Sequence, residues 1–280
     1  MHEVFINGRR RPVEASWNDF TRTRLLALMP LLYAPATTLV ALQLRLLGFL
    51  LGLSPAFFAQ FVTPVQMTQL LWLTDYLLGE SIGLTAQRLP WLRRPRTWRR
   101  PLPGKLWGPR ESLRNVSFAE FIFADAYFVA YATRQQAGAL DKLVAVLYRP
   151  QRREYRPHAA SYGGDRREDF NEHLVPGRAA QLAGLPDATK LAVLTWYRGC
   201  RDELQAHFPL VFSPPDPEAD EQPTTSSWGQ VLRELSGGAF GPLEATARQP
   251  VRLVLAKMED DARRAKELER RQAEHLRNPS

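Results

Sequence analysis

Few residue pairs in this chain have the types and spacing needed for nucleophilic or metal chemistry. Cys200, the single cysteine, lies seven residues before His207. On a helix that spacing corresponds to about 10 Å of rise, too far for a thiolate–imidazole pair. Asp169 and His173 are four residues apart and could share a helix face with Glu172 beside them, but no third metal ligand accompanies them. We therefore expect Cys200 to be a small core residue and Asp169 to form a surface charge pair with His173.

The glycine-rich segments lack the spacing of phosphate-binding loops. Residues 163–165 (GGD) fit neither GxxxxGK[ST] nor GxGxxG, and residues 237–241 lack the phosphate-binding lysine. One cysteine allows no internal disulfide, Cys-based zinc site or iron–sulfur cluster. We predict no catalytic residues, no cofactor and no metal, and hence that the protein is not an enzyme. The enzymatic alternative would join Asp125 with Asp169 or His173 from distant helices.

The segment 84–114 concentrates the basic charge of the protein. It contains nine basic residues and one acidic residue, whereas the whole chain has 37 Lys and Arg against 29 Asp and Glu. This segment therefore accounts for the entire formal net charge of +8. Its five prolines forbid a long helix. It also holds three tryptophans, Trp91, Trp98 and Trp107.

Arginine and tryptophan together suit two kinds of partner. Arginine binds phosphates while tryptophan stacks on bases, as single-stranded nucleic acid requires. The same two residue types are hot spots of protein interfaces. In the two remaining alternatives, segment 84–114 packs on the protein's own body or forms a solvated loop. The candidate partner-binding residues are Arg93, Arg94, Arg96, Trp98, Arg99, Arg100 and Trp107.

The elements that position segment 84–114 are predicted to be mainly helices. Residues 2–13 are expected to form a β-hairpin, because Asn7-Gly8 favours a tight turn and Pro12 suits an edge strand. Apolar periodicity and capping residues predict helices near 21–33, 36–53, 55–61, 64–79, 117–132, 140–148, 169–183, 187–208, 228–235 and 251–277. The predicted fold class is mainly α, a single helical domain with a short N-terminal β-hairpin and long Arg/Pro-rich loops.

The domain organisation follows from where the apolar pattern ends. Residues 1–256 are predicted to form the helical domain, which includes the basic Trp/Pro loop 84–114 and an acidic, proline-rich loop at 213–227. The apolar stripe of the last helix fades after Met258, so residues 257–280 are predicted to form a charged C-terminal helix or tail. The part of this helix from Arg263 to Arg271 is a second candidate surface.

Asp125 falls on or beside the apolar face of its predicted helix. A buried carboxylate needs a partner, since an unpaired charge in an apolar interior is costly. We therefore expect a nearby arginine to form a structural salt bridge with Asp125.

Residues 37–53 come closest to a membrane span. They number only 17, with Gln43 and Arg45 near the centre and prolines on both sides, which favours a buried helix over stable membrane insertion. The first residues have no apolar core of signal-peptide length. We therefore expect a cytoplasmic protein.

The opening of the chain resembles that of phage tail-assembly chaperones and related small phage tail proteins. The resemblance covers about the first 35 residues, in which a short strand pair ending in a tryptophan (VFINGRRRPVEASWNDFT) precedes a leucine-rich helix (TRTRLLALMPLLY). It implies a non-enzymatic cytoplasmic protein that binds an aggregation-prone tail component. The expected function is protein binding in the assembly or scaffolding of a phage-derived or tail-like particle. The alternative is a nucleic-acid-binding module that uses residues 88–114.

Overall fold

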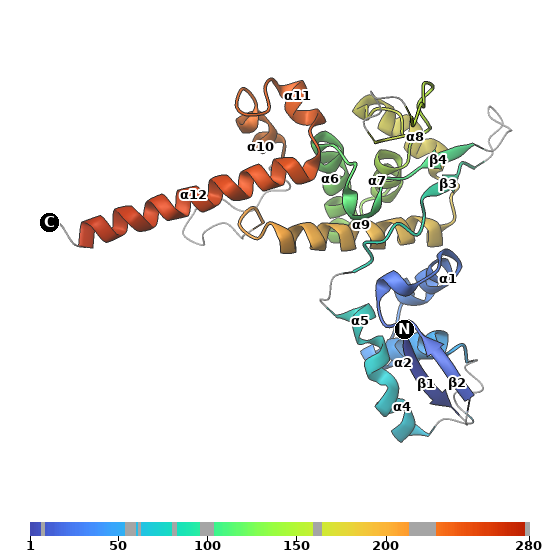
Figure 1. Ribbon diagram of the computed structural model, residues 1–280. Coiled ribbons are helices and arrows are strands. Elements are labelled where there is room, and N and C mark those ends of the chain that lie inside the picture. Colours follow the sequence, from blue (N-terminus) through green and yellow to red (C-terminus); the bar gives the residue numbers. More distant parts are fainter. Residues whose placement is uncertain are drawn as a thin grey trace. The chain divides into compact units, whose positions relative to one another are not determined.

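The protein is mainly α-helical, as predicted, and begins with the predicted β-hairpin (Figure 1). The structure, a computed structural model, describes residues 1–6, 9–53, 60, 63–79, 83–95, 104–158, 164–212 and 228–277. The chain forms two compact units. Unit 1 comprises Met1–Leu89 and Gly184–Cys200, and unit 2 comprises Pro90–Ala183 and Arg201–Ser280.

Unit 1 places the hairpin against a group of helices. Strands β1 (His2–Ile6) and β2 (Arg9–Val13) are antiparallel, with Val4 opposite Arg11. Helix α2 contacts both β2 and α1. The other elements before residue 80 are η1 (Trp17–Asp19), α1 (Arg22–Tyr33), α2 (Leu39–Leu51), α4 (Pro64–Leu70), η2 (Leu71–Thr74) and α5 (Asp75–Leu78).

The single helix predicted over 64–79 is interrupted. Residues 71–74 form a 3₁₀ turn between α4 and α5. The hydroxyl of Thr74 donates to the carbonyl of Leu71 at 2.7 Å, and this local bond competes with continuous α-helical geometry. The segment predicted as a helix at 55–61 lies almost entirely outside the described residues.

Helix α2 covers most of residues 37–53, the segment that comes closest to a membrane span in the sequence. Its leucines at 46, 47, 50 and 51 are buried. The guanidinium of Arg45 donates to the carbonyls of Leu31, Ala34 and Pro35, and so caps the end of α1. Among the described helices, none combines the length and the apolar character that crossing a membrane requires.

The first part of helix α9 (Asp187–His207) belongs to unit 1. Its Trp196 donates from Nε1 to the carbonyl of Thr85 at 3.1 Å. Cys200 is fully buried, with its Sγ 3.8 Å from the same carbonyl oxygen. The prediction that Cys200 is a core residue is therefore confirmed.

Unit 2 is built around α6, which contacts α7, α11 and α12, while α8 packs on α7. The helix predicted over 169–183 begins later, because the side chain of Asn171 accepts a hydrogen bond from the backbone N–H of His173 and starts a 3₁₀ turn there. Helix α11 was not predicted from the sequence. The elements of this unit besides the end of α9 are β3 (Trp91–Arg93), β4 (Lys105–Trp107), η3 (Glu111–Leu113), α6 (Phe118–Arg134), α7 (Ala139–Leu147), η4 (Glu172–Leu174), α8 (Val175–Leu182), α10 (Trp228–Leu235), α11 (Leu243–Arg248) and α12 (Val251–Arg277).

The predicted salt bridge of Asp125 is confirmed. Only 2% of this residue is exposed. Its Oδ1 accepts a hydrogen bond from Arg201 Nε at 2.6 Å, and its Oδ2 accepts one from Trp228 Nε1 at 3.0 Å. The Trp228 ring in turn packs edge-on against Phe121, with 5.4 Å between ring centroids. Asp125 thus joins α6, α9 and α10.

We expect Asp125→Ala to lower the free energy of unfolding by about 2 kcal/mol. The reason is that Arg201 and the indole N–H both lose their acceptor, while partial solvent access at Arg201 keeps the loss below the roughly 3–5 kcal/mol of a fully buried pair. Urea unfolding of the two proteins measures the difference. Asp260→Ala, at an exposed position of α12, is the control. Equal destabilisation by both substitutions would contradict the structural role of Asp125.

Candidate partner-binding site

A buried ion cluster fixes the loops of unit 2 to α6. At its centre is Glu120, which is 1% exposed and lies in the first turn of α6. Arg167 Nη1 donates to Glu120 Oε1 at 2.5 Å, and Arg149 Nη1 lies 3.0 Å from the same oxygen. Arg167 also pairs with Asp165 at 2.8 Å. Two loop segments, one after α7 and one before α8, are thereby held on α6.

Burial and neighbouring charges act in opposite directions on the two arginines. Burial lowers the pKa of Arg149 and outweighs the attraction of Glu120. Burial also opposes the charged form of Arg167, but Glu120 and Asp165 together raise its pKa above the usual value. Arginine stays protonated in either case. The cluster is therefore a fixed set of charges whose carboxylates are occupied by the protein's own guanidinium groups.

Short extended segments lie side by side next to this cluster. Strands β3 and β4 are antiparallel, with Trp91 opposite Trp107. Trp107 also pairs through its backbone with Arg149, and Gln151 pairs with Arg167. The basic loop predicted at 84–114 therefore contains a strand pair, the β3–β4 hairpin, hydrogen-bonded to the segment that carries the buried cluster.

Side chains of the β3–β4 hairpin alternate between two faces. On β4, Leu106 is buried, whereas Lys105 is exposed and Trp107 is half-buried. The ammonium of Lys105 lies 4.8 Å from the centroid of the Trp91 ring and 5.7 Å from that of Trp107. Because alternate residues of a strand point to opposite faces, Trp91, Lys105 and Trp107 share the outer face of the hairpin.

A second loop, which carries Tyr155 and Arg166, contributes to the outer face of the β3–β4 hairpin. The guanidinium of Arg166 lies 3.6 Å from the centroid of the Trp107 ring and 4.6 Å from that of Tyr155. Cation–π contacts contribute about 0.5–2 kcal/mol, more as they become desolvated. Rings and cations therefore alternate in a preassembled row. This row, the aromatic–cation ladder, consists of Trp91, Lys105, Trp107, Arg166 and Tyr155.

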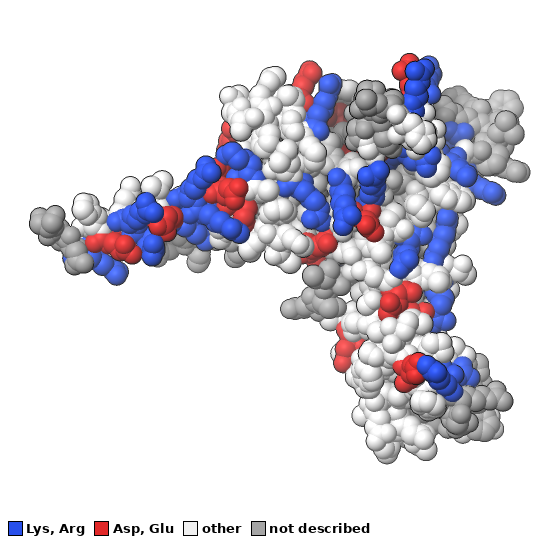
Figure 2. Space-filling model, in the orientation of Figure 1, with Lys and Arg blue, Asp and Glu red and all other residues white. Residues whose placement is uncertain are grey.

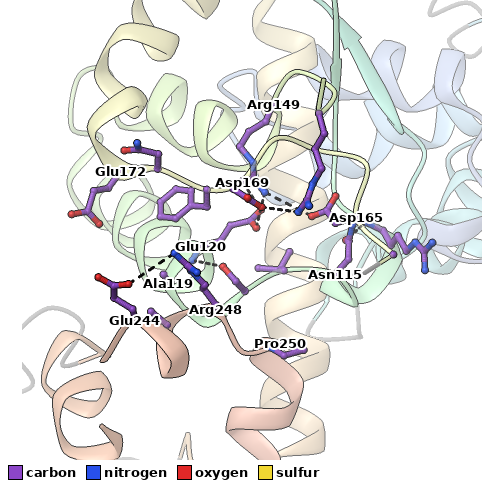
Figure 3. A pocket seen from close by; sticks show the side chains of 18 of the residues that line it. Asn115, Ala119, Glu120, Arg149, Asp165, Asp169, Glu172, Glu244, Arg248 and Pro250 are labelled. Atoms are coloured by element: carbon purple, nitrogen blue, oxygen red, sulfur yellow. Dashed lines mark hydrogen bonds and ion pairs between the residues drawn. The ribbon is translucent and has the colours of Figure 1, made fainter. Parts of the chain in front are cut away.

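A cavity of about 640 Å³, the α6 cavity, opens beside Glu120 (Figure 3). In this view Glu244 and Arg248 of α11 lie opposite Arg149 and Asp165. Farther out, Arg152 pairs with Asp169 at 2.6 Å. The charged groups of this cavity are therefore largely arranged as pairs of opposite sign.

A second cavity of about 290 Å³, the hairpin cavity, is lined by the inner face of the β3–β4 hairpin and by α8. The segment after α7 lies between the two cavities, because Tyr148 and Pro150 line the hairpin cavity whereas Arg149 and Arg152 line the α6 cavity. His173 lines both cavities. The hairpin cavity thus lies behind the ladder, on the other face of the same strands.

The structure places three of the seven predicted partner-binding residues. Arg93 is exposed at the end of β3, Arg94 lines the hairpin cavity and Trp107 belongs to the ladder. The other four, Arg96, Trp98, Arg99 and Arg100, lie outside the described residues. Tyr155 and Arg166 were not predicted from the sequence; both come from a second Arg-rich segment, residues 149–168. The pattern RREYRP at 152–157, aromatic among basic residues, was the available signal.

The predicted pairing of Asp169 with His173 is wrong. Asp169 pairs with Arg152, and the imidazole Nε2 of His173 lies 3.9 Å from Glu172. The cause is the late start of the helix, which leaves positions 169 and 173 without a common helix face. Both residues line the α6 cavity, whereas Asp125 is not part of its described lining. In the described part of the chain, no group of three or more His, Cys, Asp or Glu side chains could hold a metal ion.

The second candidate surface, Arg263 to Arg271, lies in the distal half of α12, which extends away from the other helices of its unit (Figure 1). Lys and Arg alternate with Asp and Glu along it (Figure 2). Within this half, Glu267 accepts hydrogen bonds from Arg270 and Arg271, which lower its pKa. Leu268 and Leu276 are exposed. Such pairs one turn apart support a solvated helix without a packing partner.

Comparison of the chain with models of protein families, with curated proteins and with solved structures found no match.

Proposed function

We propose that this protein is a cytoplasmic, non-enzymatic protein-binding factor that acts in the assembly or scaffolding of a phage-derived or tail-like particle. The observation that carries the proposal is the aromatic–cation ladder on the β3–β4 hairpin. Trp, Tyr and Arg are the residues enriched at the centres of protein interfaces. Rings held by neighbouring cations lose little conformational freedom on binding, which favours affinity.

The ladder supports a protein partner over nucleic acid. A base that stacked on Trp107 would have to displace the guanidinium of Arg166, which lies 3.6 Å from the ring centroid. The Nε of Arg166 is buried without a hydrogen-bond partner, which fits a guanidinium held by rings rather than one extended toward phosphate. The exposed edges of the ladder remain available to a protein surface.

The assignment to a phage-like particle is supported by the N-terminal resemblance. The hairpin β1–β2 and helix α1 lie in the segment that this resemblance covers. Trp17, the tryptophan that follows the hairpin, is buried and donates from Nε1 to the carbonyl of Tyr76 at 2.9 Å. A partner from the same particle would be a tail component.

Replacing Trp107 by alanine is expected to weaken partner binding by about tenfold or more, because truncation of a hot-spot residue costs at least about 2 kcal/mol. Affinity capture from cells that contain the particle would identify the partner, and titration of the purified partner would give the Kd. Trp72→Ala is the matched control, because Trp72 is an exposed tryptophan in unit 1. Equal affinities of the Trp107→Ala variant and the unchanged protein would contradict the proposal.

Nucleic acid is the second candidate because Lys and Arg side chains follow the β3–β4 hairpin (Figure 2). The affinity of a nucleic-acid complex would fall steeply with salt, because each neutralised phosphate releases a counterion. We expect the captured complex to survive nuclease and moderate salt. Loss of the complex on nuclease treatment would favour this second candidate.

A further inference from the structure

Two arginine side chains that line the hairpin cavity each carry a buried N–H group without an acceptor. Arg94 Nε and Arg178 Nη1 are both shielded from solvent and both lack a hydrogen-bond partner. Their side chains line the same cavity, Arg94 from the residue after β3 and Arg178 from α8. An unsatisfied buried donor of a charged group is costly, so both side chains keep unused hydrogen-bonding capacity beside the cavity.

Local contacts hold the two guanidinium groups in place. The Arg94 group lies over the backbone of Gly104, where a Cβ would come within 3.2 Å of Nη2. The backbone N–H of Arg94 donates to the carbonyl of the same glycine at 2.8 Å. Arg178 is fixed by its Nη2, which lies 3.0 Å from Glu168. One edge of the Arg178 group is therefore engaged, while Nη1 has no partner and would meet a ligand in the cavity after a small rotation of the side chain.

The charge of the cavity fits a single negative charge. Arg94 and Arg178 contribute two positive charges and the Glu168 carboxylate contributes one negative charge, while His173 and Gln181 complete the polar lining. The resulting net charge of +1 matches the single negative charge of a carboxylate better than the double charge of a phosphate dianion. Arginine donors form short, charge-assisted bonds with carboxylates.

The rest of the cavity wall is largely apolar. Leu106, Tyr148, Pro150, Leu174 and Leu182 line it. The volume of about 290 Å³ lies just below the roughly 300–1,000 Å³ of small-ligand sites, so it suits one or two side chains rather than a folded element. An acidic side chain beside an aliphatic one would satisfy both parts of the wall.

We propose that the hairpin cavity binds an acidic side chain of the protein partner together with an adjacent aliphatic side chain. This inference rests on the proposed protein-binding function and adds the chemistry of the recognised segment. The guanidinium groups of Arg94 and Arg178 bind the carboxylate, and the leucines of β4, η4 and α8 contact the aliphatic neighbour. Binding at this inner face and contact with the ladder use opposite faces of one hairpin.

The test uses the full chain and a short peptide, N-acetyl-Leu-Asp-Leu-amide. Its asparagine counterpart has nearly the same shape without the charge. Titration is followed by ¹H–¹⁵N NMR at the Arg Nε–H resonances, with that of Arg94 identified by its absence in Arg94→Lys. We expect the Asp peptide to shift this resonance and the Asn peptide to bind about tenfold more weakly or worse.

Arg178→Gln should lower the affinity for the Asp peptide by about tenfold, whereas Arg134→Gln, at an exposed position at the end of α6 and outside the cavity lining, should leave that affinity unchanged. Equal binding of the two peptides, or an Arg94 resonance that does not move at saturation, would overturn the inference. A stronger response to inorganic phosphate than to the Asp peptide would also overturn it. If partner capture depends on Trp107 but not on Arg94 and Arg178, the protein-binding function stands and this inference fails.

Discussion

Replacing Glu120 by alanine is expected to lower the free energy of unfolding by about 4 kcal/mol. The substitution removes the carboxylate that Arg149 and Arg167 share, and leaves two buried positive charges next to each other. Breaking a buried pair by removal of one partner typically costs roughly 3–5 kcal/mol, because the charge left behind remains desolvated. Asp165 retains contact with Arg167, which limits the loss.

Urea unfolding measures this effect, and two further variants identify its cause. Glu120→Gln keeps the size of the side chain but not its charge, so it should destabilise nearly as much as alanine. Glu111→Ala removes an exposed carboxylate whose pair with Arg114 is solvated, and should change stability by less than about 1 kcal/mol. If Glu120→Gln were as stable as the unchanged protein, the buried cluster would not hold the loops as described.

Replacing Gly199 by alanine is expected to lower the free energy of unfolding by about 3 kcal/mol. A Cβ at this position of α9 would lie 2.5 Å from Leu84 N, 2.6 Å from Leu84 O and 2.7 Å from Gly83 C. All three atoms belong to the backbone, so no side-chain rotation can relieve the overlap. Forcing extra volume into a packed interior costs typically about 1–3 kcal/mol, and a backbone clash lies at the upper end.

Gly177→Ala is the matched control for this prediction. Gly177 is also a helical glycine, in α8, and a Cβ there would meet no atom within 4 Å. Alanine should stabilise that helix by up to about 1 kcal/mol, because glycine is the poorer helix former. The two substitutions should therefore change the urea midpoint in opposite directions. A Gly199→Ala protein as stable as the unchanged one would show that segment 83–84 does not cross α9 at this position.

Local patterns in the sequence were sufficient for most helices. Thr21 and Ser117 each accept a hydrogen bond at a predicted helix start, and Thr38 does so two residues after the start predicted at 36. The partner of Asp125 could be predicted as a type of residue because burial requires a counter-charge, but not as Arg201, which lies 76 residues away. Capping and periodicity are local, whereas the choice of partner depends on how helices pack.

The buried ion cluster around Glu120 and the strand pair β3–β4 could not be predicted from such local patterns. Strands of three residues are too short for apolar alternation to stand out from a loop. Arg149 and Arg167 belong to a loop rich in exposed arginines, and only tertiary packing distinguishes the buried ones from Arg153 or Arg156. The predicted basic loop contributes Trp91, Lys105 and Trp107 to the ladder, but Trp107 also contacts Arg166, which comes from a second loop.

The central claim is that the outer face of the β3–β4 hairpin binds a protein. The most direct measurement places the photo-crosslinking residue p-benzoylphenylalanine at Arg93, on that face, and at Leu39, an exposed position of unit 1, as the control. After irradiation in cells that contain the particle, we expect the Arg93 position to give one discrete, nuclease-resistant protein adduct that Trp107→Ala abolishes. The same adducts from both positions, or an Arg93 adduct that Trp107→Ala leaves intact or nuclease removes, would contradict the account.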